Sequence, residues 1–223
     1  MKKIIFVLLM ILPVSGYSFG YATLPEQILQ EITALDQLSQ QVNMVQQQLQ
    51  MVQNQARNLQ GLPMQMWPNV SSQLQTLFNL VGQAQGLSYS SQNLAAQVQQ
   101  QYGDPGSTLP NYENSLQQWT RNLNSQVAST LQQYGMQAQN FQTEQGTLQA
   151  LENASQSSTG RLQALQAGNA IAGMQVNQLQ LLRQTMMSGN QAMLNAIANK
   201  SNQNQQDRNA VKDWLATPPS HGW

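Results

Sequence analysis

The sequence predicts an all-α fold: an elongated helical bundle with long antiparallel coiled-coil-like helices and a small helical head. Three observations predict it. Apolar residues recur at alternating steps of four and three through two long stretches, one near each end of the chain, which is the spacing of helices that bury a narrow stripe. The two-residue alternation typical of strands is absent from the sequence. The chain contains no cysteine, so helix packing has to stabilise it without disulfides.

Residues 21–62 are expected to form the long N-terminal helix of the bundle. Pro25 suits a first helical turn, and the Gly-Leu-Pro sequence at 61–63 is expected to end the helix. Its expected buried seam consists of Leu38, Val42, Val45, Leu49, Val52, Ala56 and Leu59. Upstream, the seam is continued by Ile28, Ile32 and Leu35, with one short step between Leu35 and Leu38 that should overwind it locally. Such a helix is about 50 Å long and needs a partner of similar length.

Residues 63–109 are expected to form the head, made of short helices and loops. A first short helix is expected over residues 70–83, where Leu74, Leu77 and Val81 share one face. Gly86 is expected to break this helix, and a second one is expected to end near residue 101, before the loop at 102–107. Because both pieces are shorter than the N-terminal helix, we expect them to pack against one end of the rod.

Residues 110–215 are expected to complete the bundle. A helix over residues 110–135 carries Trp119 in the middle of its apolar face, where core packing and contact with a partner both remain open. The last long helix is expected from about residue 137 to 200 or 215. Its seam repeats every seven residues at Leu165, Ala172, Leu179, Met186 and Met193, with Leu162, Val176 and Ile197 at the alternate position. Polar residues interrupt that alternate position, as they do where helices fix their register: Asn169, Arg183 and Asn190.

A ridge of small residues lies in the last helix, with one small side chain every four positions: Gly160, Ala164, Gly168 and Ala172. Such a ridge lets another helix approach closely, although each interior glycine costs up to about 1 kcal/mol of helix propensity. Two interpretations remain open. The ridge forms either a contact between copies of the chain or a close contact inside the bundle.

The two ends of the chain predict export and a flexible tail. Residues 1–20 have a positive head at Lys2 and Lys3, an apolar run and a small-residue cleavage region, as in a secretory signal peptide. Cleavage is expected after Gly20, with cleavage after Ala22 as the alternative. Residues 216–223 are expected to form the tail. Candidate interface residues are the tryptophans Trp119, Trp214 and Trp223.

The composition excludes several classes of function. Without Lys2 and Lys3, seven basic residues face nine acidic ones, so no basic surface is available for nucleic acid. Only 8% of residues are charged, and glutamine makes up about one residue in five. A neutral, amide-rich surface tolerates self-association, which favours a homo-oligomer. The single histidine, His221, lies in the tail, so no catalytic, cofactor, metal or small-molecule site is expected.

Three stretches resemble the TrbJ proteins of P-type conjugative transfer systems, the counterparts of the VirB-type minor pilin of type IV secretion systems. They are residues 22–23 leading into the Gln/Leu/Val-rich helix, residues 86–89 with the 102–103 loop, Tyr112 and Trp119, and the sequence GRLQALQAGN at 160–169 followed by QLQLLR at 178–183. The resemblance implies an exported helical protein at the tip of a conjugative pilus. It further implies contacts with the major pilin and other secretion subunits, and a role in pilus assembly or attachment to the recipient-cell surface.

Two alternatives have different functions. A periplasmic coiled-coil chaperone or adaptor would share the long helices, but such arms usually bind clients through charged surfaces, and this chain is nearly neutral. A wall-cleaving enzyme would need a carboxylate in a cleft. Glu144 and Glu152 are the acidic residues two turns apart on one expected helix face, and we expect both to be solvated.

Overall fold

The computed structural model describes residues 23–59, 62–103, 108–141 and 143–216. Within these ranges all regular secondary structure is helical, without strands. The α-helices there are α1 (Leu24–Asn58), α2 (Trp67–Tyr102), α3 (Thr108–Gln133), α4 (Glu144–Ser155) and α5 (Ser158–Ala216), and the short 3-10 helices are η1 (Met64–Met66) and η2 (Ala138–Phe141). The predicted all-α class is confirmed, whereas the expected signal peptide at 1–20 and Trp223 lie outside the described residues.

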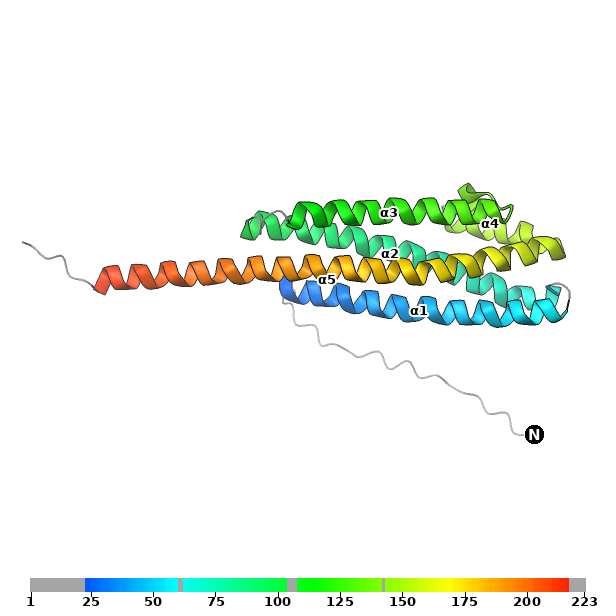
Figure 1. Ribbon diagram of the computed structural model, residues 1–223, viewed down its shortest axis with the longest axis horizontal. Helices are drawn as coiled ribbons and strands as arrows, with labels where there is room; N and C mark the ends of the chain where they lie inside the picture. The colour runs from blue at the N-terminus through cyan, green and yellow to red at the C-terminus, as the bar shows by residue number, and fades with distance from the viewer. Residues whose placement is uncertain (1–22, 60–61, 104–107, 142, 217–223) are drawn as a thin grey trace, which may run out of the picture.

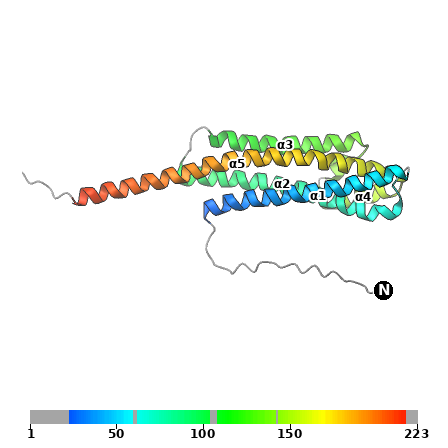
Figure 2. The same cartoon turned by 60° about the horizontal axis from the view of Figure 1, so that its bottom comes forward.

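The long helices α1, α2, α3 and α5 lie side by side along one axis (Figure 1). The chain runs up and down the rod, so that these helices alternate in direction, and the turned view shows the same arrangement (Figure 2). Helix α5 contacts the other three long helices, and α2 contacts α1 and α3. The structure is therefore an antiparallel bundle in which α5 is the central contact partner.

Helix α1 begins where the sequence supplies a cap and ends where its seam turns away from the core. The backbone N–H of Thr23 donates a 2.8 Å hydrogen bond to the Glu26 carboxylate, which satisfies a donor at the helix start. A buried, mainly apolar stripe then runs along the helix from Ile28 to Ala56. Burial of this stripe against α2 and α5 stabilises a helix whose other positions are mostly Gln and Asn.

The expected head of short helices at 63–109 is wrong. Helix α2 continues without a break through Gly82 and Gly86, and it runs along the bundle beside α1 and α3. The interpretation failed because the buried face of α2 changes to small side chains, Ala84, Ser88 and Ser91, before Leu94 resumes it. Burial of this face outweighs the two glycines, each of which costs about 1 kcal/mol of helix propensity.

Replacing Gly86 by alanine is expected to stabilise the protein by about 0.5–1 kcal/mol, because a Cβ at Gly86 would meet no atom within 4 Å. Urea denaturation followed by circular dichroism measures the change. Gly103 provides the matched control, because a Cβ there would also meet no atom within 4 Å, but its φ is +84°. Alanine at Gly103 is expected to destabilise the protein, and equal effects at the two glycines would contradict the prediction.

The last long helix also differs from its expected boundaries. The chain from 137 onwards first forms η2 and α4, and α5 begins only at Ser158. Side-chain caps explain the division: Thr143 accepts a 3.0 Å hydrogen bond from the Gly146 N–H at the start of α4, and Ser157 accepts one of 2.9 Å from the Gly160 N–H at the start of α5. The short elements η2 and α4 thus lie between α3 and α5 in the chain, and α4 is at one end of the bundle (Figure 1).

Candidate functional site

The structure brings most of the expected seam residues of α1 and α5 into one core. Those that are buried are Leu38, Val42, Val45, Leu49, Val52, Leu165, Leu179 and Met186. Val176 is only partly buried, because the neighbouring Gln175 takes the innermost position. Leu59 is 58% exposed, contrary to its place in the expected seam. It follows the last residue of α1 with φ −96° and ψ 3°, so its side chain no longer follows the helical register.

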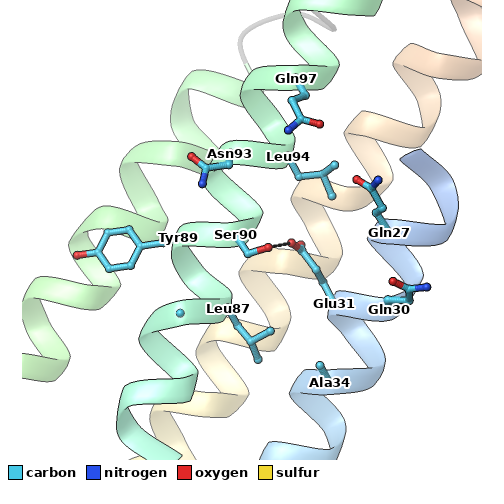
Figure 3. A pocket seen from close by; sticks show the side chains of 11 residues that line it. Gln27, Gln30, Glu31, Ala34, Leu87, Tyr89, Ser90, Asn93, Leu94 and Gln97 are labelled. Atoms are coloured by element: carbon cyan, nitrogen blue, oxygen red, sulfur yellow. Dashed lines mark hydrogen bonds between the residues drawn. The ribbon is translucent and has the colours of Figure 1, made fainter. Parts of the chain in front are cut away.

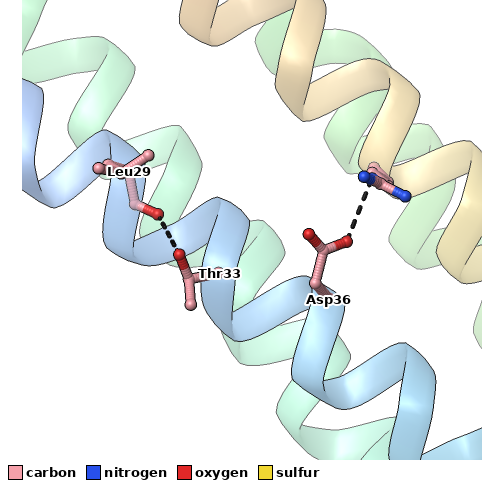
Figure 4. A network of polar contacts seen from close by, with 4 residues as sticks. Leu29, Thr33 and Asp36 are labelled. Atoms are coloured by element: carbon pink, nitrogen blue, oxygen red, sulfur yellow. Dashed lines mark hydrogen bonds and ion pairs between the residues drawn. The ribbon is translucent and has the colours of Figure 1, made fainter.

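The polar interruptions of the α5 seam have different environments. Asn169 donates hydrogen bonds to the Leu49 carbonyl at 3.2 Å and to the Gln53 side chain at 3.1 Å. Arg183 forms a 3.2 Å ion pair with Asp36 of α1 at the surface of the bundle (Figure 4). Asn190 is buried in the core. Asn169 and Arg183 therefore link α5 directly to α1 and can fix the register between the two helices.

The small-residue ridge packs inside the bundle at its central positions. Ala164, Gly168 and Ala172 are buried, whereas Gly160 is partly exposed. A Cβ at Gly168 would collide with the Leu74 side chain of α2, and the Leu49 side chain of α1 would lie 3.4 Å away. Between the two open interpretations, these contacts favour close packing within the bundle at Gly168.

The tryptophans divide between core and surface. Trp119 is 2% exposed, and its indole N–H donates a 2.8 Å hydrogen bond to the Gln178 carbonyl of α5. It therefore belongs to the core and not to a free candidate interface. Trp214 is 77% exposed near the end of α5, so it remains available to a partner.

A polar cluster joins α1, α2 and α3, in which Glu31, Ser91 and Tyr112 are buried and Ser90 is exposed. The Ser90 hydroxyl donates a 2.6 Å hydrogen bond to the Glu31 carboxylate (Figure 3). Ser91, the next residue of α2, shares a hydrogen bond with the Tyr112 hydroxyl of α3. Burial raises the pKa of the Glu31 carboxyl, against the lowering effect of hydrogen bonds from Ser90 and Ser91. Burial likewise raises the pKa of Tyr112, which the bond from Ser91 lowers and the Glu31 charge raises.

Sequence reasoning missed Glu31, although its spacing was a usable signal. The buried stripe of α1 runs through Ile28, Glu31, Leu35 and Leu38, at steps of three, four and three. Assignment of Ile32 to the seam in place of Glu31 produces the short step before Leu38. With Glu31 on the seam the heptad is regular, so the expected local overwinding has no basis.

A groove of about 630 Å³ lies beside this cluster, between α1 and α2. Figure 3 shows its lining, which is formed by Gln27, Gln30, Glu31, Ala34, Gly86, Leu87, Tyr89, Ser90, Asn93, Leu94 and Gln97. Among these described residues, Glu31 is the one with a carboxylate. The cluster and groove pair this carboxylate with hydroxyl and amide groups, which can form hydrogen bonds.

Replacing Glu31 by glutamine is expected to raise the free energy of unfolding at neutral pH. The folded-state pKa lies above the ordinary value of 4.5, so the folded protein binds this proton more tightly than the unfolded chain. The stabilising contribution of protonated Glu31 is present at low pH and is lost as pH rises through the pKa of the folded state. Glutamine keeps the acceptor for Ser90 without the charge, so the advantage of the variant should shrink as pH falls from the raised pKa of folded Glu31 towards the ordinary value of 4.5.

Urea denaturation at several pH values, from neutral down to the ordinary carboxyl pKa of 4.5, measures this difference. Glu152→Gln, at an exposed position of α4, is the control and should leave the stability unchanged. A Glu31→Gln effect of constant size over this pH range would contradict the prediction, because it would assign the effect to shape and not to ionisation.

The described residues offer few features of other functional classes. Within them, no group of three His, Cys, Asp or Glu side chains is placed to hold a metal ion. No helix in this part of the chain combines the length and apolar character needed to cross a membrane. Glu152, one of the two acids weighed for wall cleavage, lies exposed on α4. The described residues thus define an elongated helical-bundle protein in which polar side chains link the helices by hydrogen bonds.

Comparison with known proteins identifies the family. The chain is 31% identical over 164 residues to the conjugal transfer protein TrbJ of Rhizobium radiobacter, and 34% identical over 164 residues to a probable conjugal transfer protein TrbJ of Sinorhizobium fredii (strain NBRC 101917 / NGR234). Each match covers 71% of this chain and 60% of the relative. The chain belongs to the TrbJ family. No protein-family model matches it, and no solved structure matches it either.

Proposed function

We propose that this protein is a structural component of a conjugative type IV secretion system, a minor pilin at the pilus tip that acts in pilus assembly and recipient-cell attachment. The observation that carries the proposal is the similarity to two conjugal transfer proteins over 164 residues. Because the chain spans 60% of the length of these relatives, their role is applied here as a proposal for this chain. The proposed role is structural and not enzymatic.

The physical character of the chain supports an extracellular structural role. The signal-like sequence at 1–20 supports export through the inner membrane to the periplasm and then to the pilus. The low charge and amide-rich surface support assembly with copies of itself and with other subunits, since like-charge repulsion is small. The expected partners are therefore the major pilin, other secretion subunits, a second copy of this chain and the recipient-cell surface.

Immunogold labelling of conjugating cells tests this location. We expect label at the ends of pili and loss of plasmid transfer when the gene is deleted, with recovery when it is supplied again. Label confined to the cell body with bare pilus tips would contradict the proposal. If the purified chain instead prevented aggregation of an unfolded outer-membrane protein, the periplasmic chaperone or adaptor would become the better interpretation.

A further inference from the structure

The C-terminal part of α5 extends beyond the rest of the bundle. It projects past the near ends of α1, α2 and α3 in both views (Figures 1 and 2). Every residue from 198 to 216 is exposed, which amounts to about five helical turns without a neighbouring helix. No other described part of the same chain covers this segment.

A helix of this composition is poorly stable alone. In proteins most helical stability comes from packing of an apolar face on neighbouring elements rather than from helix propensity, and this part of α5 lacks such packing within the described chain. The segment contains Ser and several Asn and Asp residues, which are weak helix formers. It also exposes three large apolar side chains near its end: Val211 is 56%, Trp214 77% and Leu215 70% exposed. Both features favour a segment that becomes stable by packing on a partner.

The spacing of this segment matches a narrow helix contact. From Ile197, the residues of one face are Ser201, Asn204, Arg208, Val211 and Leu215, at steps of four, three, four, three and four. Asp207 and Lys212 flank this face on opposite sides, five residues apart. In a parallel coiled coil, a flanking residue such as Asp207 on one helix lies beside the residue five positions later, here Lys212, on the other helix.

Charge favours a second copy of the chain as the partner. Parallel packing places Asp207 of each copy beside Lys212 of its neighbour, whereas antiparallel packing brings each flank against the same flank of the other copy. The charged residues of 198–216 are three bases and two acids, Lys200, Asp207, Arg208, Lys212 and Asp213. This composition lacks the cluster of basic residues by which helices bind anionic membranes.

We propose that residues 198–216 of neighbouring copies pack in parallel, with Val211 and Leu215 in the contact and Asp207 paired with Lys212 between chains. The inference rests on the proposed assembly of this chain into a homo-oligomer, and it identifies residues 198–216 as a surface through which the copies contact each other. Polar seam residues such as Asn204 and Arg208 fix register at a cost in stability. The contact therefore forms when interactions elsewhere have already brought the subunits together. Because the helices pack in parallel, the bundles of all copies lie at the same end of the contact.

Cysteine crosslinking tests the orientation, because the natural chain has no cysteine. Ser201→Cys and Arg208→Cys place thiols on the seam about two turns apart, and Gln206→Cys places one on the opposite face as the matched control. In cells that carry pili, both seam variants should form disulfide-linked dimers and the control should not. Crosslinking at only one seam position, as in antiparallel packing, would overturn the proposal, and so would crosslinking at neither.

Charge reversal tests the pairing. Asp207→Lys or Lys212→Asp alone should lower the yield of Ser201→Cys dimers about fivefold, because each creates like charges between chains. The double variant should restore the yield, and residues five apart on one helix cannot produce this rescue within a single chain. Absence of rescue would overturn the pairing. If these crosslinks are absent but pili still carry label at their tips and plasmid transfer persists, the assignment of 198–216 as a contact is wrong. The proposed function is then unaffected.

Discussion

Replacing Trp119 by alanine is expected to lower the free energy of unfolding by about 3–5 kcal/mol. The indole is 2% exposed at the contact between α3 and α5, so truncation leaves a large cavity in a closely packed core. It also removes the donor to the Gln178 carbonyl, at 2.8 Å in the structure. Urea denaturation followed by circular dichroism measures the loss.

Two variants separate the causes of this effect. Trp119→Phe keeps most of the packing and loses the hydrogen bond, so it should cost less than Trp119→Ala. Trp214→Ala is the matched control, because it removes the same atoms from a side chain that is 77% exposed. It should leave the stability of the bundle unchanged. A Trp119→Ala variant as stable as Trp214→Ala would contradict the core assignment and return Trp119 to the candidate interface.

The sequence predicted the rod because its long helices carry large apolar residues at regular spacing. From Leu38 to Val52 the stripe of α1 contains only Leu and Val, and each of these residues is buried. The same method failed in α2, where Ala84, Ser88 and Ser91 replace large side chains on the buried face. A periodic pattern is detected by the contrast between apolar and polar residues. Alanine and serine on the buried face differ little in hydrophobicity from the neighbouring glycines, so the pattern is lost there.

The polar cluster escaped prediction for a related reason. Glu31 occupies a regular seam position, but a carboxylate there is expected at the surface unless its partners are known. Ser90 and Ser91, the hydrogen-bond partners of Glu31, come from a helix about 60 residues further along the chain, and Tyr112, which bonds to Ser91, lies about 80 residues further along. Their approach depends on how three helices pack together. A single sequence specifies the helical faces more directly than it specifies the depth at which each polar group lies.

Replacing Gly189 by alanine is expected to destabilise the protein by about 1–3 kcal/mol. A Cβ at this position of α5 would lie well inside van der Waals contact with three ring carbons of Tyr112. The ring is buried and its hydroxyl is bonded to Ser91, so it cannot turn away as a flexible side chain would. The gain of up to about 1 kcal/mol in helix propensity should not offset this collision.

Gly173 of the same helix is the matched control. A Cβ there would meet the end of the flexible Gln46 side chain at 3.3 Å, so Gly173→Ala should be neutral or slightly stabilising. A double-mutant cycle with Tyr112→Leu tests the cause directly. The cost of Gly189→Ala should fall in the Tyr112→Leu background, because the smaller side chain leaves room for the methyl group. If Gly189→Ala is as stable as the natural chain, Tyr112 does not pack against α5 at this glycine, and the polar cluster has a different geometry.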